Sequence, residues 1–468
     1  MLKKIQQDFS YYSHEFKDNY RKGVHRLRTI LASRAQAQAF VSNAGGVAVV
    51  LGYEPETPDK NAQELYALLA ASPYIDDAVQ TFLGSIYEAG AESQDAMYSD
   101  SARCLEILHD PVLSRAAGAG TVSAGKWIAT LAGQSCNLYR DMNAVAASDI
   151  AMTAVAASET AMAAVVSNAT ALNAVVTSQL ALNAVAASET AMAAVIGNVT
   201  ALNAVVTSQL AMNAVAASET AMTAVIANTA AFNTVVTSHV AMNAVASSYV
   251  AVAAVYESAV AVEAVKANET AWATLTGASS AVMGKAAAKL AGLNPADYAD
   301  MTAVASSSTA MAAIEKSQVA KDAIAASDMA TAKYAVGAAG LKPADYANMA
   351  AVAASQTAMA AVAASSTART AITNSATAKN ALASSPLKTT VTKGNGNGWE
   401  NRTIRNGMGY LISCYNANSG GEAGSTWYKL DGAQTSQPAG TTNVGKFFTS
   451  SLAIYWWSST SSVTYIPC

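Results

Sequence analysis

The sequence predicts a mainly α-helical fold: an elongated, solenoid-like or bundled shaft of ten-residue helical repeats, with a helical N-terminal head and a small β-rich C-terminal tip. Three observations support this. A ten-residue repeat runs from about residue 142 to residue 272, the segment before it is charged, aromatic and non-repetitive, and the segment after residue 386 is rich in Gly, Asn and aromatic residues. No catalytic constellation is apparent, so the pattern indicates a shape and a mechanical role rather than a reaction.

Each repeat unit has the apolar pattern of a short amphipathic helix. In one unit, Ala161, Met162, Ala164 and Val165 occupy positions i, i+1, i+3 and i+4 and cluster on one side of a two-turn helix. Ala, Leu, Met and Glu favour helix. The bulky apolar residue recurs every ten positions, and a Val follows three residues after most of these positions. The bulky residues are Met152, Met162, Leu172, Leu182, Met192, Leu202, Met212, Met222, Phe232 and Met242.

The ten-residue period does not fit one continuous helix. Ten residues at 100° each fall about 80° short of three full turns, so the apolar stripe would slide around a straight helix. Ser158, Ser188 and Ser218 each precede a Glu, as expected of an N-cap followed by an acidic first turn. We therefore expect the chain to bend at each Ser or Asn cap and the short helices to pack side by side.

A thirty-residue superperiod overlies the repeat. The string TALNAVVTSQ begins at both Thr170 and Thr200, and other units resemble the unit three places away more than their neighbours. A three-sided coil with stacked equivalent edges gives this pattern, as does duplication of a thirty-residue block without that geometry. Three chains wound together, with Met and Val facing a common axis, form another alternative. One unit cannot bury its apolar face alone, so stacking or association is required.

The composition excludes several classes of protein. The chain has 468 residues, 13% of them charged, and a net charge of −4, which gives no reason to expect nucleic-acid binding. No run of eighteen apolar residues predicts a membrane span, and the N-terminus lacks the apolar core of a secretory signal peptide. The four Cys and four His are too scattered to predict a disulfide framework, a metal site or a cofactor site. Cys414 and Cys468 are expected either to pair or to remain free.

Residues 1–135 predict a helical head. Lys3 to Arg28 has the pattern of a basic amphipathic helix. Its basic face is either a solvated face opposite a packing face or a surface that binds membrane or nucleic acid. Gly45 to Pro58 predicts a turn-rich break, and Gly118 to Gly125 predicts a hinge of small residues. The other predicted helices cover residues 62–71, 75–89 and 101–109.

The predicted shaft has a first section at 136–277 and a second and third section within 278–386. Two similar joints divide the later sections, because LNPADYADMTAVA at 293–305 is echoed by LKPADYANMAAVA at 341–353. Pro295 and Pro343 suit the first turn of a helix. The joints are expected to be bends or places where the packing of chains changes.

Residues 387–468 predict a small β module, since short aromatic runs alternate with Gly- and Asn-rich turns. Aromatic faces stack on sugars, and Asn side chains in turns form directional hydrogen bonds. Core packing is the alternative role for each aromatic residue in so small a module. The candidate receptor-binding residues are Trp399, Trp427, Tyr428, Trp456, Trp457, Asn416 and Asn418, with Asn395 and Asn397 beside them.

The order of head, low-charge repetitive shaft and aromatic tip resembles the tail fibres of tailed bacteriophages. The unit AMNAVAAS, Ala241 to Ser248, is similar to the Ala/Ser/Val-rich shafts of some such fibres, and YWWSST, Tyr455 to Thr460, is similar to strings near the end of some C-type-lectin-like modules. The resemblance implies a homotrimeric virion protein, assembled in the host cytoplasm. It implies that residues 1–135 attach to tail or baseplate proteins, and that the tip contacts a host glycan or outer-membrane protein.

Other functions compete with receptor recognition. A purely structural fibre would use its tip to cap the shaft or bind another virion protein. A glycan-degrading tip would usually need a pair of carboxyl groups, whereas Glu400, Glu422 and Asp431 form no recognisable pair, so we expect no enzyme. A bacterial adhesin is disfavoured by the missing export signal. An ice-binding surface would need a regular Thr ladder, which the repeat lacks.

Overall fold

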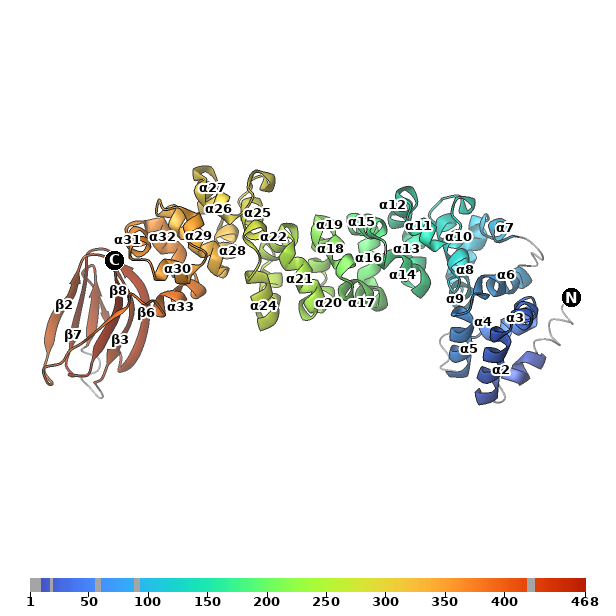
Figure 1. Cartoon of the computed structure of the whole chain (residues 1–468), viewed down its shortest axis with the longest axis horizontal. Helices are drawn as coiled ribbons and strands as arrows, with labels where there is room; N and C mark the ends of the chain where they lie inside the picture. Colours follow the sequence, from blue (N-terminus) through green and yellow to red (C-terminus); the bar gives the residue numbers. More distant parts are fainter. Residues whose placement is uncertain (1–9, 17–19, 55–59, 88–92, 419–425) are drawn as a thin grey trace. The chain divides into compact units, whose positions relative to one another are not determined.

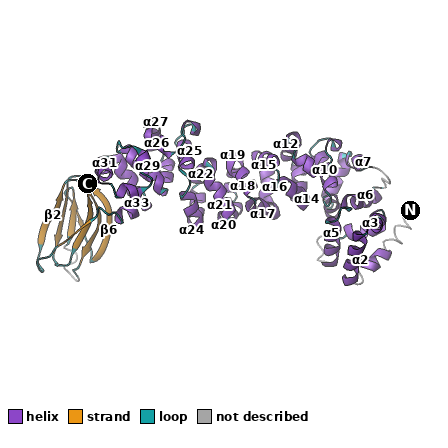
Figure 2. Cartoon of the chain, viewed as in Figure 1, coloured by secondary structure: helices purple, strands orange, loops and turns teal. Residues whose placement is uncertain are grey.

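The computed structural model describes residues 10–16, 20–54, 60–87, 93–418 and 426–468. The described chain is mainly helical, and its strands fall within residues 389–467 (Figures 1 and 2). The chain divides into two compact units, Met1–Ala241 and Met242–Cys468. The predicted mainly α class with a small β-rich C-terminal region is therefore confirmed.

The first unit begins with helices around one apolar core. Leu27, Phe40, Val50, Leu65 and Trp127 are all buried there. The predicted helices at 62–71 and 101–109 are present, as is most of the one at 75–89. Within the expected Lys3–Arg28 helix, residues 10–16 and 20–28 are helical, and the rest lies outside the described residues. These helices are α2 Tyr20–Ala32, α3 Arg34–Val41, α4 Ala44–Leu51, α5 Lys60–Ala70, α6 Ile75–Ile86, α7 Gln94–Tyr98, α8 Ser101–His109, α9 Pro111–Ala117 and α10 Thr121–Leu131.

Two predictions for the head were wrong in part, and glycine packing explains both. The first half of the turn-rich break predicted at 45–58 is helix α4, which Asn43 caps by accepting the Gly46 N–H at 2.7 Å; residues 52 and 53 are bends, and residues 55–58 lie outside the described residues. A Cβ on Gly46 would lie 2.9 Å from the Phe40 ring, so glycine here permits close packing rather than a turn. The predicted hinge ends inside α10, where a Cβ on Gly125 would lie 2.3 Å from the backbone of Asp141.

The repeat of the first unit folds into helices of eight or nine residues after a shorter first one. Four consecutive pairs within this stretch are bent by 98°, 98°, 104° and 99°. The predicted bends at Ser and Asn corners are thus confirmed. The helices are α11 Met142–Ala146, α12 Asp149–Ala157, α13 Glu159–Val166, α14 Ala169–Val176, α15 Gln179–Ala187, α16 Glu189–Gly197, α17 Val199–Thr207, α18 Gln209–Ala217, α19 Glu219–Ala227 and α20 Thr229–Thr237; α21, His239–Ser247, contains the division between the units.

From α11 to α17, each helix packs beside the helix three places later. Helix α12 contacts α15 and α15 contacts α18, while α13 contacts α16 and α16 contacts α19. The bulky apolar residue and the Val of each unit, such as Met152 and Val155, are buried between these helices within one chain. The alternative in which Met and Val face an axis shared by three chains does not match this packing.

The corner serines connect successive layers of helices. The Ser188 side chain accepts the Ala191 N–H at 3.2 Å, as an N-cap of its own helix, and its hydroxyl donates to the Ala156 carbonyl at 2.5 Å. That carbonyl lies in the last turn of α12, where backbone acceptors lack partners within their own helix. The same 32-residue link joins Ser178 to Ala146.

Longer helices interrupt the repeat at three joints. In each joint an eleven-residue helix leads through a glycine with positive φ and a three-residue 3₁₀ helix into a short helix. The sequence predicted the second and third joints, and Pro295 and Pro343 do begin 3₁₀ helices. The additional joint consists of α10, the 3₁₀ helix η1 Cys136–Leu138 and α11; the others are α25, η2, α26 and α29, η3, α30.

The second unit contains the remaining helices and both sheets. Its helices are α22 Tyr249–Glu257, α23 Ala259–Lys266, α24 Glu269–Thr276, α25 Ser280–Leu290, η2 Pro295–Asp297, α26 Met301–Ser306, α27 Ser308–Lys316, α28 Gln318–Ala326, α29 Asp328–Ala338, η3 Pro343–Asp345, α30 Met349–Ala353, α31 Gln356–Ala364, α32 Ser366–Asn374 and α33 Ala376–Ala383. The strands are β1 Thr389–Thr392, β2 Glu400–Asn406, β3 Gly409–Asn416, β4 Trp427–Leu430, β5 Ala433–Ser436, β6 Gly440–Phe448, β7 Ser451–Trp456 and β8 Ser462–Pro467.

The strands form two four-stranded antiparallel sheets. Sheet A has the order β1-β8-β3-β6 and sheet B the order β2-β7-β4-β5. Leu411, Phe448 and Val463 of sheet A share one buried cluster with Ile454 and Trp456 of sheet B, so the sheets pack face to face. The opposite side of sheet A packs on helices, because Tyr410 and Ile466 belong to a cluster that includes residues of α31 and α33 (Figure 1). Only sheet B therefore has a face without a packed layer among the described residues.

Candidate functional site

The outer face of sheet B follows from the alternation of its strands. In β7, Leu452, Ile454 and Trp456 are buried toward sheet A, while Ala453 and Tyr455 between them are partly exposed. Successive side chains of a strand point to opposite faces, so Tyr455 lies on the outer face. Its partner on β4 is Trp427 and its partner on β2 is Asn401.

Four aromatic side chains on this face form an aromatic ladder, which we define as Trp399, Tyr455, Trp427 and Trp457. The Trp399 and Tyr455 rings stack with centroids 4.7 Å apart and planes 7° apart. Tyr455 also stacks on Trp427, with centroids 5.2 Å apart and planes 17° apart. Trp457 meets Trp399 edge to face at 5.4 Å. Each such pair contributes about 0.5–1.5 kcal/mol beyond the area it buries, so the ladder holds its own geometry.

Polar and cationic groups surround the aromatic ladder. The Lys429 ammonium lies 4.6 Å from the Trp427 ring centroid, within the range of a cation–π contact. All four residues of β5, the edge strand beside Trp427, are exposed. Trp399 is the most open ring, with 37% of its surface exposed, and the other three rings are partly buried. The face thus combines an apolar ridge with hydrogen-bonding groups at its margin.

The structure separates the predicted aromatic candidates into two sets. Trp399, Trp427 and Trp457 lie in the aromatic ladder. Tyr428 and Trp456 are 4% and 0% exposed and fill the core between the sheets, so they do not present their rings on this surface. The strand alternation explains the difference, because Tyr428 and Trp456 each neighbour a ladder residue in sequence and point to the opposite face.

The predicted Asn candidates have structural partners. Asn416 and Asn418 are 1% and 7% exposed, and the Asn416 amide donates to the Gln437 carbonyl at 3.1 Å. Asn397 accepts the Ser459 N–H at 3.1 Å, and Asn395 has the positive φ of 50° that a tight turn requires. The two buried Asn residues therefore order loops from within and do not face the aromatic ladder.

Sequence reasoning missed Tyr455. The signal was present in β7, where polar or small residues alternate with Leu452, Ile454 and Trp456. Reading that stretch as a half-buried strand would have placed Tyr455 and Trp457 on one face and Trp456 on the other. The stacking of Tyr455 between two Trp residues depends on cross-strand register and was not available from this pattern.

Asp431 fixes the end of sheet B. It sits with φ of 51° in the Asp–Gly turn between β4 and β5, and its carboxylate accepts the N–H groups of Thr449, Ser450 and Ser451 at 2.6–3.1 Å. Partial burial raises its pKa, but these hydrogen bonds outweigh that effect and lower the pKa to about 2. A carboxylate held ionised by structural bonds is poorly suited to donating a proton.

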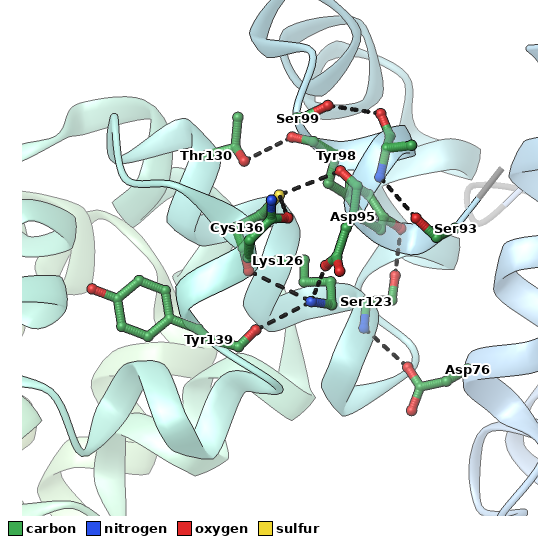
Figure 3. Close-up of polar contacts among 12 residues, drawn as sticks. Asp76, Ser93, Asp95, Tyr98, Ser99, Ser123, Lys126, Thr130, Cys136 and Tyr139 are labelled. Atoms are coloured by element: carbon green, nitrogen blue, oxygen red, sulfur yellow. Dashed lines mark hydrogen bonds and ion pairs between the residues drawn. The ribbon is translucent and has the colours of Figure 1, made fainter.

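A second cluster of polar groups surrounds Lys126 in the first joint along the chain, which consists of α10, η1 and α11 (Figure 3). The Lys126 ammonium pairs with the Asp95 carboxylate and donates to the carbonyls of Cys136 and Tyr139 at 3.5 and 3.3 Å. Nearby, Asp76 accepts the Ser123 N–H at 3.0 Å and caps α10; burial raises the pKa of Asp76, while its backbone hydrogen bonds oppose that shift. The Lys126 donors are engaged within the chain, so this cluster serves the fold.

Three further features of the described ranges concern metal ions, thiols and membranes. No group of three or more His, Cys, Asp and Glu residues there is arranged to hold a metal ion. All four cysteines, including Cys414 and Cys468, are free thiols. No single described helix is long and apolar enough to span a membrane, although five bent helix pairs reach the required length and composition.

Comparison with known proteins adds no assignment. No family model matches the sequence, and the search of curated proteins finds no relative.

Proposed function

We propose that this chain is a structural fibre protein of a phage tail, in which a helical solenoid carries a β domain that recognises the host cell surface. The aromatic ladder on the outer face of sheet B is the single observation that carries the binding part of the proposal. It leaves stacked, partly exposed rings on a face that no described helix covers, whereas the corresponding side of sheet A is packed.

The solenoid is supported by three linked features of the repeat. Consecutive helices turn by about 100°, every third helix packs side by side, and corner serines bond across layers 32 residues apart. In such an arrangement each layer buries its apolar residues only against the next, so length can grow by adding units. Such an arrangement is a three-sided coil, one of the alternatives compatible with the thirty-residue superperiod, and it suits a load-bearing spacer.

The resemblance to phage tail fibres supplies the biological setting of the proposal. It places the protein in the virion tail after synthesis in the host cytoplasm, as a homotrimer whose residues 1–135 bind tail or baseplate proteins. The β domain would bind a host glycan or an outer-membrane protein, with no cofactor and no catalytic role.

A glycan is the favoured ligand because of the chemistry around the aromatic ladder. Apolar ring surface suits the C–H faces of a sugar, and the hydroxyl and amide groups of β5 beside it suit sugar hydroxyls. Because the rings already stack on one another, their side chains would lose little conformational freedom on binding.

The proposal is tested with the full chain on an array of bacterial surface polysaccharides. Trp399→Ala combined with Trp427→Ala should weaken binding at least tenfold. Trp272→Ala is the matched control, since Trp272 is also partly exposed and has the Lys266 ammonium 5.6 Å from its ring, but lies on α24. Equal binding by the double variant and the control would contradict the assigned surface.

A purely structural fibre is the second candidate, and one observation favours it. The ladder rings stack on one another, so much of their face area is already occupied by protein. If the wild-type chain binds neither the array nor intact host cells, and the β domain instead co-purifies with another virion protein, this second function replaces the first. Release of reducing ends from a bound polysaccharide would instead indicate glycan-degrading activity.

A further inference from the structure

The helical repeat of the first unit has three outward sides with different chemistry. Each side is a stack of every third helix, and the second residue of each helix shows the difference. On α13, α16 and α19 this residue is Thr, and on α14, α17 and α20 it is Thr, Thr and Ala. On α12, α15 and α18 it is apolar: Ile150, Leu180 and Leu210, which we define as the apolar edge.

The apolar edge is exposed to different degrees along its length, and an exposed apolar residue also occurs on another side of the repeat, because Val199 of α17 is 74% exposed. Ile150 is 72% exposed and Leu210 is 36% exposed, and Leu180 between them is partly exposed. Because α12 packs on α15 and α15 on α18, the three side chains occupy equivalent places in successive layers. Single exposed apolar residues need no explanation, whereas here an apolar residue recurs at the same helix position every thirty residues along one side of the stack.

Charge distinguishes the apolar edge from the neighbouring side. From residue 149 to residue 237, the charged residues are Asp149, Glu159, Glu189 and Glu219, with no Lys or Arg. The three Glu residues begin α13, α16 and α19, so that side would repel an identical side of another copy. The apolar side carries only Asp149, at its end, and its next two helices begin with Gln179 and Gln209.

The other groups on the apolar side are compatible with copies of themselves. Gln179 donates to Asn183 at 2.8 Å, and Gln209 donates to Asn213 at the same distance. An amide both donates and accepts hydrogen bonds, so such a pair can face an identical pair without an unmatched group. A charged side chain lacks this property.

We propose that the apolar edge is the surface through which a second copy of this chain associates, parallel and in register. A rotation axis that relates the two copies and runs parallel to the helix stack brings each layer against the same layer of the partner. Ile150, Leu180 and Leu210 then each contact the same residue of the other copy. The Glu-bearing side then remains in solvent. The parallel direction rests on the proposed fibre function, which requires all β domains at one end, whereas the surface itself follows from exposure and charge.

The first test measures the mass of the full chain by mass photometry. The wild type should exceed the monomer mass of 47.7 kDa, and the triple variant Ile150→Gln, Leu180→Gln, Leu210→Gln should return to it or dissociate at a concentration at least tenfold higher. The matched control is Thr160→Gln, Thr190→Gln, Thr220→Gln on the Glu-bearing side, which should behave as the wild type. A monomeric wild type, or equal dissociation of both triple variants, overturns the proposal.

The second test reports whether the two copies run parallel or antiparallel. In a Cys468→Ser background, which leaves only the buried Cys104, Cys136 and Cys414, Ile150→Cys, Leu180→Cys and Leu210→Cys are made singly and oxidised. Self-cross-linking at all three positions supports the parallel arrangement. Cross-linking at position 180 alone indicates antiparallel copies and overturns it. Glycan binding is scored separately, so a monomer that still binds contradicts this inference and the homotrimer but leaves the proposed recognition of the host surface standing.

Discussion

The Ser188 hydroxyl donates a hydrogen bond of 2.5 Å to the carbonyl oxygen of Ala156, 32 residues earlier in the chain. Ser218 and Ala186 repeat this relationship at the next equivalent corner. Where a joint intervenes, the interval shortens to 27 residues, as between Ser317 and Leu290. One small side chain at each of these corners therefore supplies an acceptor to the start of its own helix and a donor to the end of a helix in the preceding layer.

Replacement of Ser188 by Ala should destabilise the helical repeat by about 1–3 kcal/mol. The change removes an N-cap and leaves the Ala156 carbonyl without its donor. The matched control is Ser167→Ala, because the exposed Ser167 hydroxyl bonds only within its own helix and its removal should cost about 0.5 kcal/mol or less. Urea denaturation followed by far-ultraviolet circular dichroism measures both; equal midpoints would show that the link between layers contributes nothing.

Val185→Asp should unfold part of the repeat, whereas Asn183→Asp should be nearly silent. Val185 is 5% exposed and has no cationic partner nearby in sequence, so an aspartate there would be a buried charge costing roughly 3–5 kcal/mol. Asn183 lies on the exposed side of the same helix. Thermal unfolding of the two variants tests the assigned faces, which are wrong if both shift the melting temperature alike.

Two glycine-to-alanine substitutions should have opposite effects. A Cβ at Gly125 would lie 2.3 Å from the backbone of Asp141, and backbone cannot yield as a side chain can, so Gly125→Ala should cost about 1–3 kcal/mol. Gly197, at the end of α16, has no atom within 4 Å of its Cβ position, and Gly197→Ala should stabilise by about 0.5–1 kcal/mol. Chemical denaturation distinguishes them, and a stable Gly125→Ala would contradict the close approach in the first joint.

The β domain should lose stability as the pH falls from about 4 toward 2. Hydrogen bonds lower the pKa of Asp431 to about 2 in the folded state, below the ordinary value of 3.8. The folded state therefore binds fewer protons than the unfolded state, so the stabilisation is present above pH 4 and disappears as the pH falls through the folded pKa. The effect is modest, because the residue is exposed.

Asp431→Asn provides the comparison for this pH dependence. Asn tolerates the positive φ of 51° at this position but cannot accept the same set of hydrogen bonds as a carboxylate. Tryptophan fluorescence during urea unfolding at pH 7, 4 and 2.5 should show the wild-type advantage shrinking at low pH. An advantage that is constant with pH would rule out Asp431 as its source.

Much of the helical architecture was predictable because it depends on local chemistry. The ten-residue period excluded a straight helix, the Ser and Asn residues marked the corners, and the Met and Val residues marked the buried side; each of these follows from residues close together in the chain. The exceptions were glycines. Gly46 and Gly125 are residues typical of turns, but both lie in helices. Glycine makes room there for a neighbouring element: the Phe40 ring of the preceding helix in one case and the Asp141 backbone in the other.

The candidate surface was less predictable than the fold. Composition marked the C-terminal aromatic residues as a group, but Trp456 at the end of β7 is buried, whereas Trp457, directly after that strand, is partly exposed. The approach of Trp399, Tyr455 and Trp427 depends on how three strands align, and no local pattern specifies that alignment.

Helix periodicity, caps and turn residues act within a few positions, so local patterns were enough to predict short capped helices followed by a β module. Tertiary contacts set the neighbours of each helix and the aromatic rings that stay in solvent. These contacts join segments about thirty or more residues apart, such as those of Trp427 and Tyr455, where packing and strand register, rather than local preference, set the free energy.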